Sequence, residues 1–465
     1  MKKVLILLAI CLFVALIGGV IFSRVMIGYF TPDLLVQQLE SRLNCRAEVA
    51  SVDAYWLGKS RLVIKGVSLA ERDDAVKSGT PFAERLPLGD PPIHVGMIEL
   101  KLKPGSLLLR RLYVNELNFD GLAIDMTMLA DGKTSINSIF KRAPGGDPGQ
   151  DMEKPNSEKK APPLKEKKVF TAGKIPLAVF ADHAGFTNSS LSLTVEKTGA
   201  VIQLKEANFE FSGIDVNPRN LAAQNRADFD FSGKIAVGKG TSGARAFEAA
   251  IRGSGETKPF DPELAQWEPS WKSEVVLAKG SRLDTVPVME NLKKKLEAVN
   301  RPGIELSGIM ASGELEEDAV TEISYKRGRY AFEKDFLLNF GDTMIEVHPD
   351  SWIDSADSQH EIKAAVTASE SFTKEVKTKA QAYLNELTGG RAPEAVVSTL
   401  MMAITKENRL HLEVVSSGDL SKPKPDLATP IGNLRDLMKG SGDTIKNLKE
   451  LGKEFLDGFL KKKGK

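Results

Sequence analysis

The amino-terminal end of this chain is an unbroken apolar run, Val4 to Phe22, in a sequence that is otherwise largely polar. As a helix, a run of this length spans about 28 Å, which is close to the thickness of the hydrocarbon core of a bilayer. We therefore expect residues 1–30 to form a transmembrane anchor, and the rest of the chain to be tethered to a membrane. Representative residues of this anchor are Val4, Leu8, Leu12, Leu16 and Phe22.

The charges beside the apolar run predict its orientation. Lys2 and Lys3 precede the run, which places the amino terminus in the cytoplasm and the body of the protein on the other side of the membrane. The alternative is a cleaved signal peptide, whose apolar region is usually shorter and ends at a small-x-small site. Because the run ends in Gly18–Arg24 without such a site, we favour an uncleaved single-pass anchor.

Composition narrows the class of protein further. The chain has two cysteines, Cys11 in the expected anchor and Cys45 beyond it, so we expect no disulfide framework. The net charge of +1 and the small number of aromatic residues argue against a nucleic-acid partner. The body must therefore be stabilised by burial of apolar surface and by pairing of its own backbone.

The first part of the body, residues 31–140, is predicted to be a short helix followed by a β-meander. Thr31 and Pro32 are typical of a helix start, and Leu35, Leu39 and Leu43 then recur at helical spacing. Period-two strands follow at 61–69, with a kink at Gly66, and at 98–103. We expect strands 109–119 and 122–128 to form a hairpin that turns at Asp120–Gly121.

The next segment, residues 141–170, is predicted to be a disordered linker or long loop. It is rich in Pro, Gly and charge and contains almost no large apolar residue. Such a segment cannot bury enough surface to offset the entropy lost on ordering.

Strand patterning returns in residues 171–425, which we expect to form a β-groove body with helical insertions. The sequence FEFSG at Phe209–Gly213 recurs as FDFSG at Phe229–Gly233, a spacing that suits one β-hairpin for each repeat. The expected helices are 288–299, 372–387 and 393–405. Residues 426–465 have the period of an amphipathic helix, which either packs on the protein or lies on a membrane.

No catalytic, cofactor or metal-ligand constellation is evident from the sequence. The five histidines, including His348, are isolated, without a ligand partner at a useful spacing. Asp182 and His183 could supply half of an acid–base pair, but no G-x-S-x-G motif accompanies them. The sequence therefore predicts a protein that is not an enzyme.

Several motifs resemble the AsmA-like proteins of Gram-negative envelopes. After the anchor and the short helix come an amphipathic strand at 62–69, the corner Ser106-Leu107-Leu108, and a turn at Asp131–Asn137. This turn is similar to the family's D-G-x-x-N pattern, with Asn137 two places later. The segment LEVVSSGDLSKP, Leu412 to Pro423, resembles the family's closing strand. The resemblance covers residues 1–140 and about 410–445.

The resemblance implies a mainly β protein with a few helices. A transmembrane helix would precede an elongated, curved antiparallel sheet that forms an open groove, closed or flanked by short helices. The groove would be apolar inside and would take the acyl chains of phospholipid or another lipid. The family implies a periplasmic body held in the inner membrane that supports outer-membrane biogenesis and phospholipid homeostasis, with envelope assembly proteins as candidate partners.

Alternating apolar residues are the candidates for the inner face of such a groove. Each of them could equally belong to an ordinary protein core, and the alternative function is a non-enzymatic, membrane-anchored scaffold or regulator of outer-membrane protein assembly. The candidates are Leu122, Ile124, Met126, Met128, Leu191, Leu193, Val195, Phe209, Phe211, Phe229 and Phe231.

Overall fold

The computed structural model describes residues 31–55, 60–103, 105–106, 110–143, 170–239, 245–282, 293–294, 297, 313–387, 401, 404–420 and 423–427. The predicted anchor, most of the predicted linker, the carboxy-terminal helix and the helices expected near 288–299 and 393–405 lie wholly or largely outside these residues. Among the residues that are described, no helix has the length and apolar character needed to cross a membrane. The chain divides into two compact units, residues 1–273 and 274–465.

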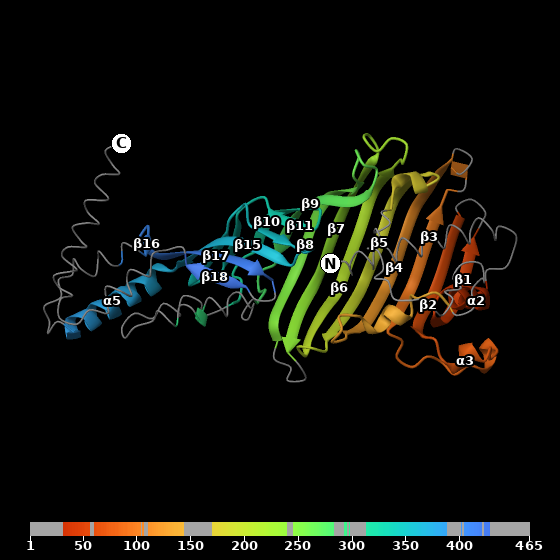
Figure 1. Ribbon diagram of the computed structural model, residues 1–465, viewed down its shortest axis with the longest axis horizontal. Coiled ribbons are helices and arrows are strands. Elements are labelled where there is room, and N and C mark those ends of the chain that lie inside the picture. The colour runs from red at the N-terminus through yellow and green to blue at the C-terminus, as the bar shows by residue number, and fades with distance from the viewer. Residues whose placement is uncertain are drawn as a thin grey trace, which may run out of the picture. The chain divides into compact units, whose positions relative to one another are not determined.

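The first unit is built mainly from long strands (Figure 1). Strand β9 begins in this unit and ends beyond its boundary. The elements are α2 (Pro32–Arg42), β1 (Cys45–Tyr55), β2 (Ser60–Glu71), α3 (Asp74–Lys77), η1 (Phe82–Glu84), β3 (Ile93–Leu102), β4 (Arg111–Met128), η3 (Ser135–Ser138), η4 (Ala172–Lys174), β5 (Ala178–Val195), β6 (Ala200–Val216), β7 (Asn225–Lys239), β8 (Arg245–Phe260) and β9 (Trp267–Leu277).

Helix α2 confirms the helix expected after the anchor. The Thr31 hydroxyl accepts a hydrogen bond from the Leu34 amide at 3.3 Å, and Pro32 occupies the first turn, where its missing N–H is not needed. Leu35 and Val36 are buried on the side of the helix that faces the sheet. The helix is therefore attached to the sheet by an apolar stripe.

Strands β1 to β8 pair in chain order, each with the next, and seven pairings make one sheet. Six of these are antiparallel, whereas β4 and β5 are parallel, which corrects the prediction of a wholly antiparallel sheet. Parallel neighbours require the chain to return to the other end of the sheet between them. The long connection from Met128 to Ala178, which contains the predicted linker, makes that return.

The predicted hairpin turn at Asp120–Gly121 is wrong. Strand β4 continues through these residues, and Gly121 adopts φ +67° within the strand. Gly66 in β2 has φ +61°, Asn188 in β5 has φ +52° and Glu206 in β6 has φ +50°. The strand registers place these four positions along a line that crosses the sheet.

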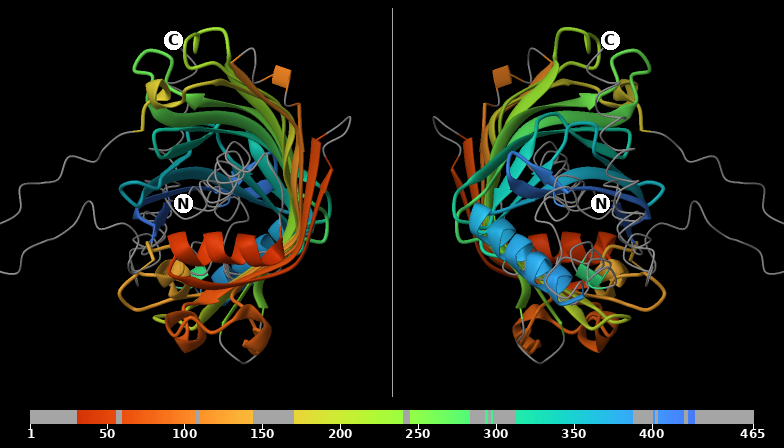
Figure 2. Two further views of the ribbon diagram at one scale, coloured as in Figure 1. Left: turned by 90° about the vertical axis from the view of Figure 1, so that its right-hand side faces the viewer. Right: turned by 90° about the vertical axis from the view of Figure 1, so that its left-hand side faces the viewer.

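This line of irregular residues bends the sheet, because β-bulges kink a strand and increase its local twist. Figure 2 shows the strands of the first unit curving, with α2 on the concave side. Polar side chains join the strands along the line. Asp120 Oδ1 accepts hydrogen bonds from Thr187 Oγ1 and Asn188 Nδ2, both at 2.8 Å, and Asn208 Oδ1 accepts one from the Asn188 amide at 3.0 Å.

The second unit is a smaller β-structure with one long helix. Its elements are β10 (Ala319–Lys326), β11 (Arg329–Phe332), β12 (Phe336–Asn339), β13 (Thr343–Val347), β14 (Trp352–Asp354), β15 (Gln359–Ala368), α5 (Glu370–Leu387), β16 (Thr405–Lys406), β17 (Arg409–Asp419) and β18 (Lys424–Leu427). Helix α5 confirms the helix expected at 372–387.

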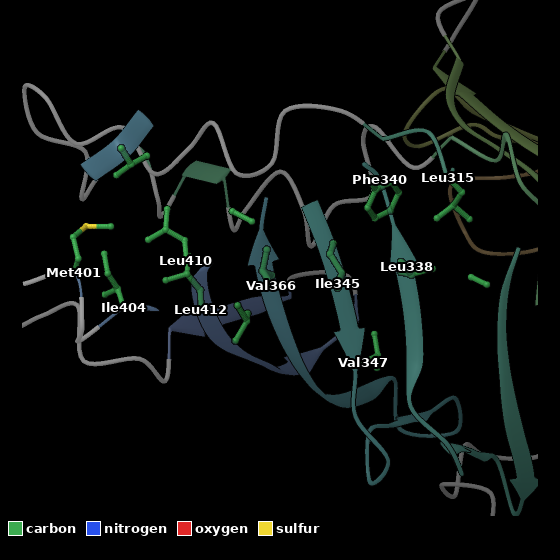
Figure 3. Close-up of a cluster of buried hydrophobic side chains, with 14 of the residues drawn as sticks. Leu315, Leu338, Phe340, Ile345, Val347, Val366, Met401, Ile404, Leu410 and Leu412 are labelled. Atoms are coloured by element: carbon green, nitrogen blue, oxygen red, sulfur yellow. The ribbon is translucent and has the colours of Figure 1, made fainter. Parts of the chain in front are cut away.

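The described residues of the second unit contain a cluster of buried apolar side chains (Figure 3). Val376 and Ala380 of α5 pack in the same cluster as Leu410 and Leu412 of β17, and these four side chains are at most 3% exposed. The described part of α5 therefore packs against β17 and contributes to the core of this unit.

Candidate functional site

The apolar face of the first unit's sheet is the candidate functional site. The registers align apolar residues in rows that run across the strands, because paired residues point to the same face. One row joins Ile124, Leu191, Leu204, Ile235 and Ala249 of β4 to β8. The next row along the strands joins Met126, Leu193, Ile202, Val237 and Phe247.

On the other side of the line of irregular residues, aromatic side chains occupy the same apolar face of the sheet. Phe209 pairs with Phe231, and Phe211 pairs with Phe229, so the two copies of the sequence repeat lie opposite each other on β6 and β7. Their rings form one cluster. Phe209 and Phe211 contact edge-to-face at 4.7 Å between centroids, and Phe209 stacks on Phe229 at 5.9 Å. Such pairs stabilise the folded state by roughly 0.5–1.5 kcal/mol beyond the area they bury.

Two further rings, which are not among the predicted groove residues, belong to this cluster. Phe186 of β5 stacks on Phe209 at 5.7 Å, and Trp271 of β9 meets Phe229 edge-to-face at 6.2 Å. The period-two pattern indicates Ile202 and Leu204, since they alternate with Gln203 and Lys205. The signal is weaker for Ile235 and Val237, because the residue between them is Ala236. Phe186 was harder to assign, because the irregular residue Asn188 inverts the alternation within β5.

The structure places all eleven predicted groove residues on this face and divides them into two groups. Leu122 and Ile124 lie in a buried cluster, and Met126 and Leu191 pack against it. The seven others lie outside that cluster: Met128, Leu193, Val195, Phe209, Phe211, Phe229 and Phe231. Of these, Phe229 is 7% exposed and the rest are half-buried.

The difference between the two groups follows from what covers them. Val36 and Leu43 from the α2 segment, and Ile136 and Ile139 from the η3 segment, pack in the cluster with Leu122 and Ile124. In the described part of the chain, α2 contacts β1 while η3 contacts β2 and β4. The cover therefore protects the β1–β4 half of the apolar face, and for Leu122 and Ile124 the interpretation as protein core is the correct one.

The opposite face of the same strands is polar. Asp228 and Asp230 alternate with Phe229 and Phe231 and are exposed, as the sequence pattern indicates. The row Glu116, His183, Ser212, Asp228 and Glu256 crosses β4 to β8 on this side. A sheet with one apolar and one polar face must shield the apolar face from water by some means.

Asp182 and His183 do not form an acid–base pair. They are neighbours in strand β5, so their side chains point to opposite faces. Asp182 accepts hydrogen bonds from the Tyr113 hydroxyl at 2.6 Å and from Asn115 Nδ2 at 3.0 Å. His183 instead contacts Glu210 on the next strand.

The first unit also contains a largely polar cavity of about 690 Å³, which is lined in part by Met126 of the predicted groove. Its lining includes Ser68, His94 and Asp125 together with the loop around Pro91. The Ser68 hydroxyl lies 3.0 Å from His94 Nδ1. This pair satisfies the hydrogen-bonding needs of the buried Ser68, and the cavity is separate from the aromatic cluster.

Comparison with protein-family models, curated proteins and solved structures finds no match for this chain.

Proposed function

We propose that the protein binds lipid on the part of the apolar face, over strands β5 to β8, that the described residues leave uncovered. In this proposal the body is periplasmic, an amino-terminal helix holds it in the inner membrane, and it carries or transfers phospholipid or another acyl lipid during outer-membrane biogenesis. The proposal rests on the apolar face and on the motifs that resemble AsmA-like proteins.

The observation that carries the proposal is the contrast between the two halves of one face. Under α2, the apolar side chains are packed by protein and buried. Over β5 to β8, equally apolar side chains such as Leu193, Ile202 and Phe211 are half-buried. In soluble proteins, contiguous apolar patches larger than roughly a few hundred Å² mark sites of interaction or ligand binding.

The proposed mechanism is passive solvation of acyl chains and involves no reaction. Each Å² of apolar surface removed from water contributes about 25 cal/mol, so burying a few hundred Å² offsets the entropy lost on binding. The residues from Ala184 to Val195 of β5 extend about 36 Å at the usual rise of a strand, which gives room for a chain to lie along the strands. The polar outer face keeps the sheet soluble on its other side.

The test is mass spectrometry of the lipids that co-purify with the full chain, compared between two adjacent substitutions. Phe211→Asp places a charge on the apolar face, whereas Ser212→Asp places the same charge on the outer face of the same strand. We expect Phe211→Asp to lose most of the bound lipid, because a carboxylate in contact with acyl chains is strongly disfavoured. Ser212→Asp should retain it.

A second pair of adjacent substitutions lies outside the aromatic cluster, so its result does not depend on whether a charge among the rings prevents folding. Ile202→Asp alters the apolar face and Gln203→Asp the outer face, away from the rings. Circular dichroism of all four variants checks that the strands form. Lipid loss in the two inner variants alone supports the proposal. Lipid no more abundant than in a similarly treated control protein would contradict it and favour the scaffold function.

A further inference from the structure

The second unit brings three metal-ligating side chains together on one hairpin. Asp335 directly precedes β12, while Glu346 and His348 lie in and just after β13. Strands β12 and β13 are antiparallel, with Phe336 opposite Val347, so Asp335 falls opposite His348. Glu346 and His348 are two residues apart and therefore share a face. His348 is isolated in the sequence because its nearest partner in space, Asp335, lies across the hairpin.

The ligand atoms of these residues are close enough to share an ion. One oxygen or nitrogen atom from each residue lies within 4.8 Å of the other two. His348 Nδ1 is 3.5 Å from Asp335 Oδ1 and 3.9 Å from Glu346 Oε1. Ligands bound to zinc at about 2.0–2.2 Å are separated by little more than 3 Å, so small side-chain rotations would complete the site.

The negative charges of Asp335 and Glu346 also favour a bound cation. In the described part of the chain, Asp335 and Glu346 each form an ion pair with His348, which is charged only when protonated. The neighbouring Lys334 pairs with Glu322, and Lys363 pairs with Glu361. Two carboxylates therefore flank one imidazole, and a set of one imidazole nitrogen and two carboxylate oxygens is one that divalent metal ions accept.

We propose that Asp335, Glu346 and His348 bind a divalent transition-metal ion, with zinc the best fit. One imidazole and two carboxylates suit zinc, and water would fill the remaining positions because the side chains are 33–51% exposed. The ion would join the start of β12 to β13 and so stabilise this hairpin. The site lies in the second unit and does not depend on the proposed lipid binding.

The test measures zinc affinity of the full chain, purified in detergent with a tag that contains no histidine. Competition with a chromophoric zinc chelator gives the dissociation constant. We expect His348→Ala and Glu346→Gln each to weaken zinc binding at least tenfold. His183→Ala is the matched control, since His183 is also an exposed histidine beside a glutamate but is not part of a three-ligand cluster. Its affinity should equal that of the wild type.

Hydrogen exchange locates the ion independently. Zinc should slow amide exchange in residues 336–347 of the wild type and of His183→Ala, but not of His348→Ala. Circular dichroism in the presence of a chelator shows whether the variants are folded to the same extent. Zinc binding of equal strength in the wild type and His348→Ala, or protection elsewhere in the chain without protection of this hairpin, would overturn the proposal.

Discussion

At the scale of single residues, Gly255 provides the space that the aromatic cluster needs. It lies opposite Phe229 on the neighbouring strand. A Cβ atom at this position would come within 2.8 Å of Phe229 Cζ and would also contact the Lys272 carbonyl oxygen of β9. The ring of Phe229 therefore occupies space that any other residue would take.

We expect Gly255→Ala to destabilise the first unit by about 1–3 kcal/mol, because overpacking displaces both the ring and the β8–β9 backbone. Gly173→Ala is the control, since no atom lies within 4 Å of a Cβ built there. Urea unfolding of both variants measures the change in free energy. Equal stability of the two variants would show that the cluster is loosely packed.

Cys45 carries a buried thiol, and the fold lowers the reactivity of this group. The residue is 0% exposed. Burial, the larger cause, and the nearby carboxylate of Glu40 together raise the pKa of the thiol from 9.0 to about 12. Because the folded-state pKa lies above the unfolded one, the associated stability is fully present below about pH 9. It is lost as the pH rises towards 12.

We predict that Cys45 resists alkylation in the native protein at pH 8.5 and reacts readily in urea, because only the exposed thiolate is nucleophilic. A Cys11→Ser background lets the mass change after iodoacetamide treatment report on Cys45 alone. Equal rates of alkylation in the presence and absence of urea would contradict the burial of this thiol.

At the scale of elements, a buried ion pair connects α2 to the rest of the first unit. Glu40 of α2 accepts hydrogen bonds from Arg85 Nη1 at 2.8 and 3.0 Å and from the Ala47 amide of β1 at 3.1 Å. The side chains of Glu40 and Arg85 are 7% and 10% exposed. The pair therefore holds the covering helix in position over β1.

Glu40→Ala should destabilise the first unit by about 3–5 kcal/mol, because it leaves the Arg85 cation buried without its partner. The double variant Glu40→Ala/Arg85→Ala should lose less free energy of unfolding than the two single variants lose in sum, since it has no unpaired buried charge. Chemical denaturation of the three variants gives the coupling free energy. A coupling near zero would mean that the pair does not hold α2.

The elements also show what could be predicted from the sequence. The alternation of Phe229 and Phe231 with two aspartates predicted their faces correctly, because a strand's period of two depends only on local order. The Asp120–Gly121 pair was interpreted as a turn, since the same residues suit a hairpin and a bulge. Only the pairing of β4 with its neighbours distinguishes the two, and that pairing is not local.

At the scale of the whole molecule, the sequence identified a mainly β chain and a set of apolar positions, but not what covers each of them. Leu122 and Phe211 have the same pattern in sequence, yet the first is packed beneath α2 and the second is not. The covering residue Ile136 comes from the connection between two parallel strands, and β4–β5 parallel pairing was not foreseen. The Asp335–His348 contact likewise depends on a non-local feature, the pairing of β12 with β13.

Photocrosslinking would show whether lipid lies on the apolar face over β5 to β8. A photoreactive amino acid replaces Phe211 in one variant of the full chain and Ser212 in another, and irradiation is carried out in intact cells. We expect a lipid adduct, detected by mass spectrometry, at position 211 and none at position 212. Adducts at both positions or at neither would contradict this expectation.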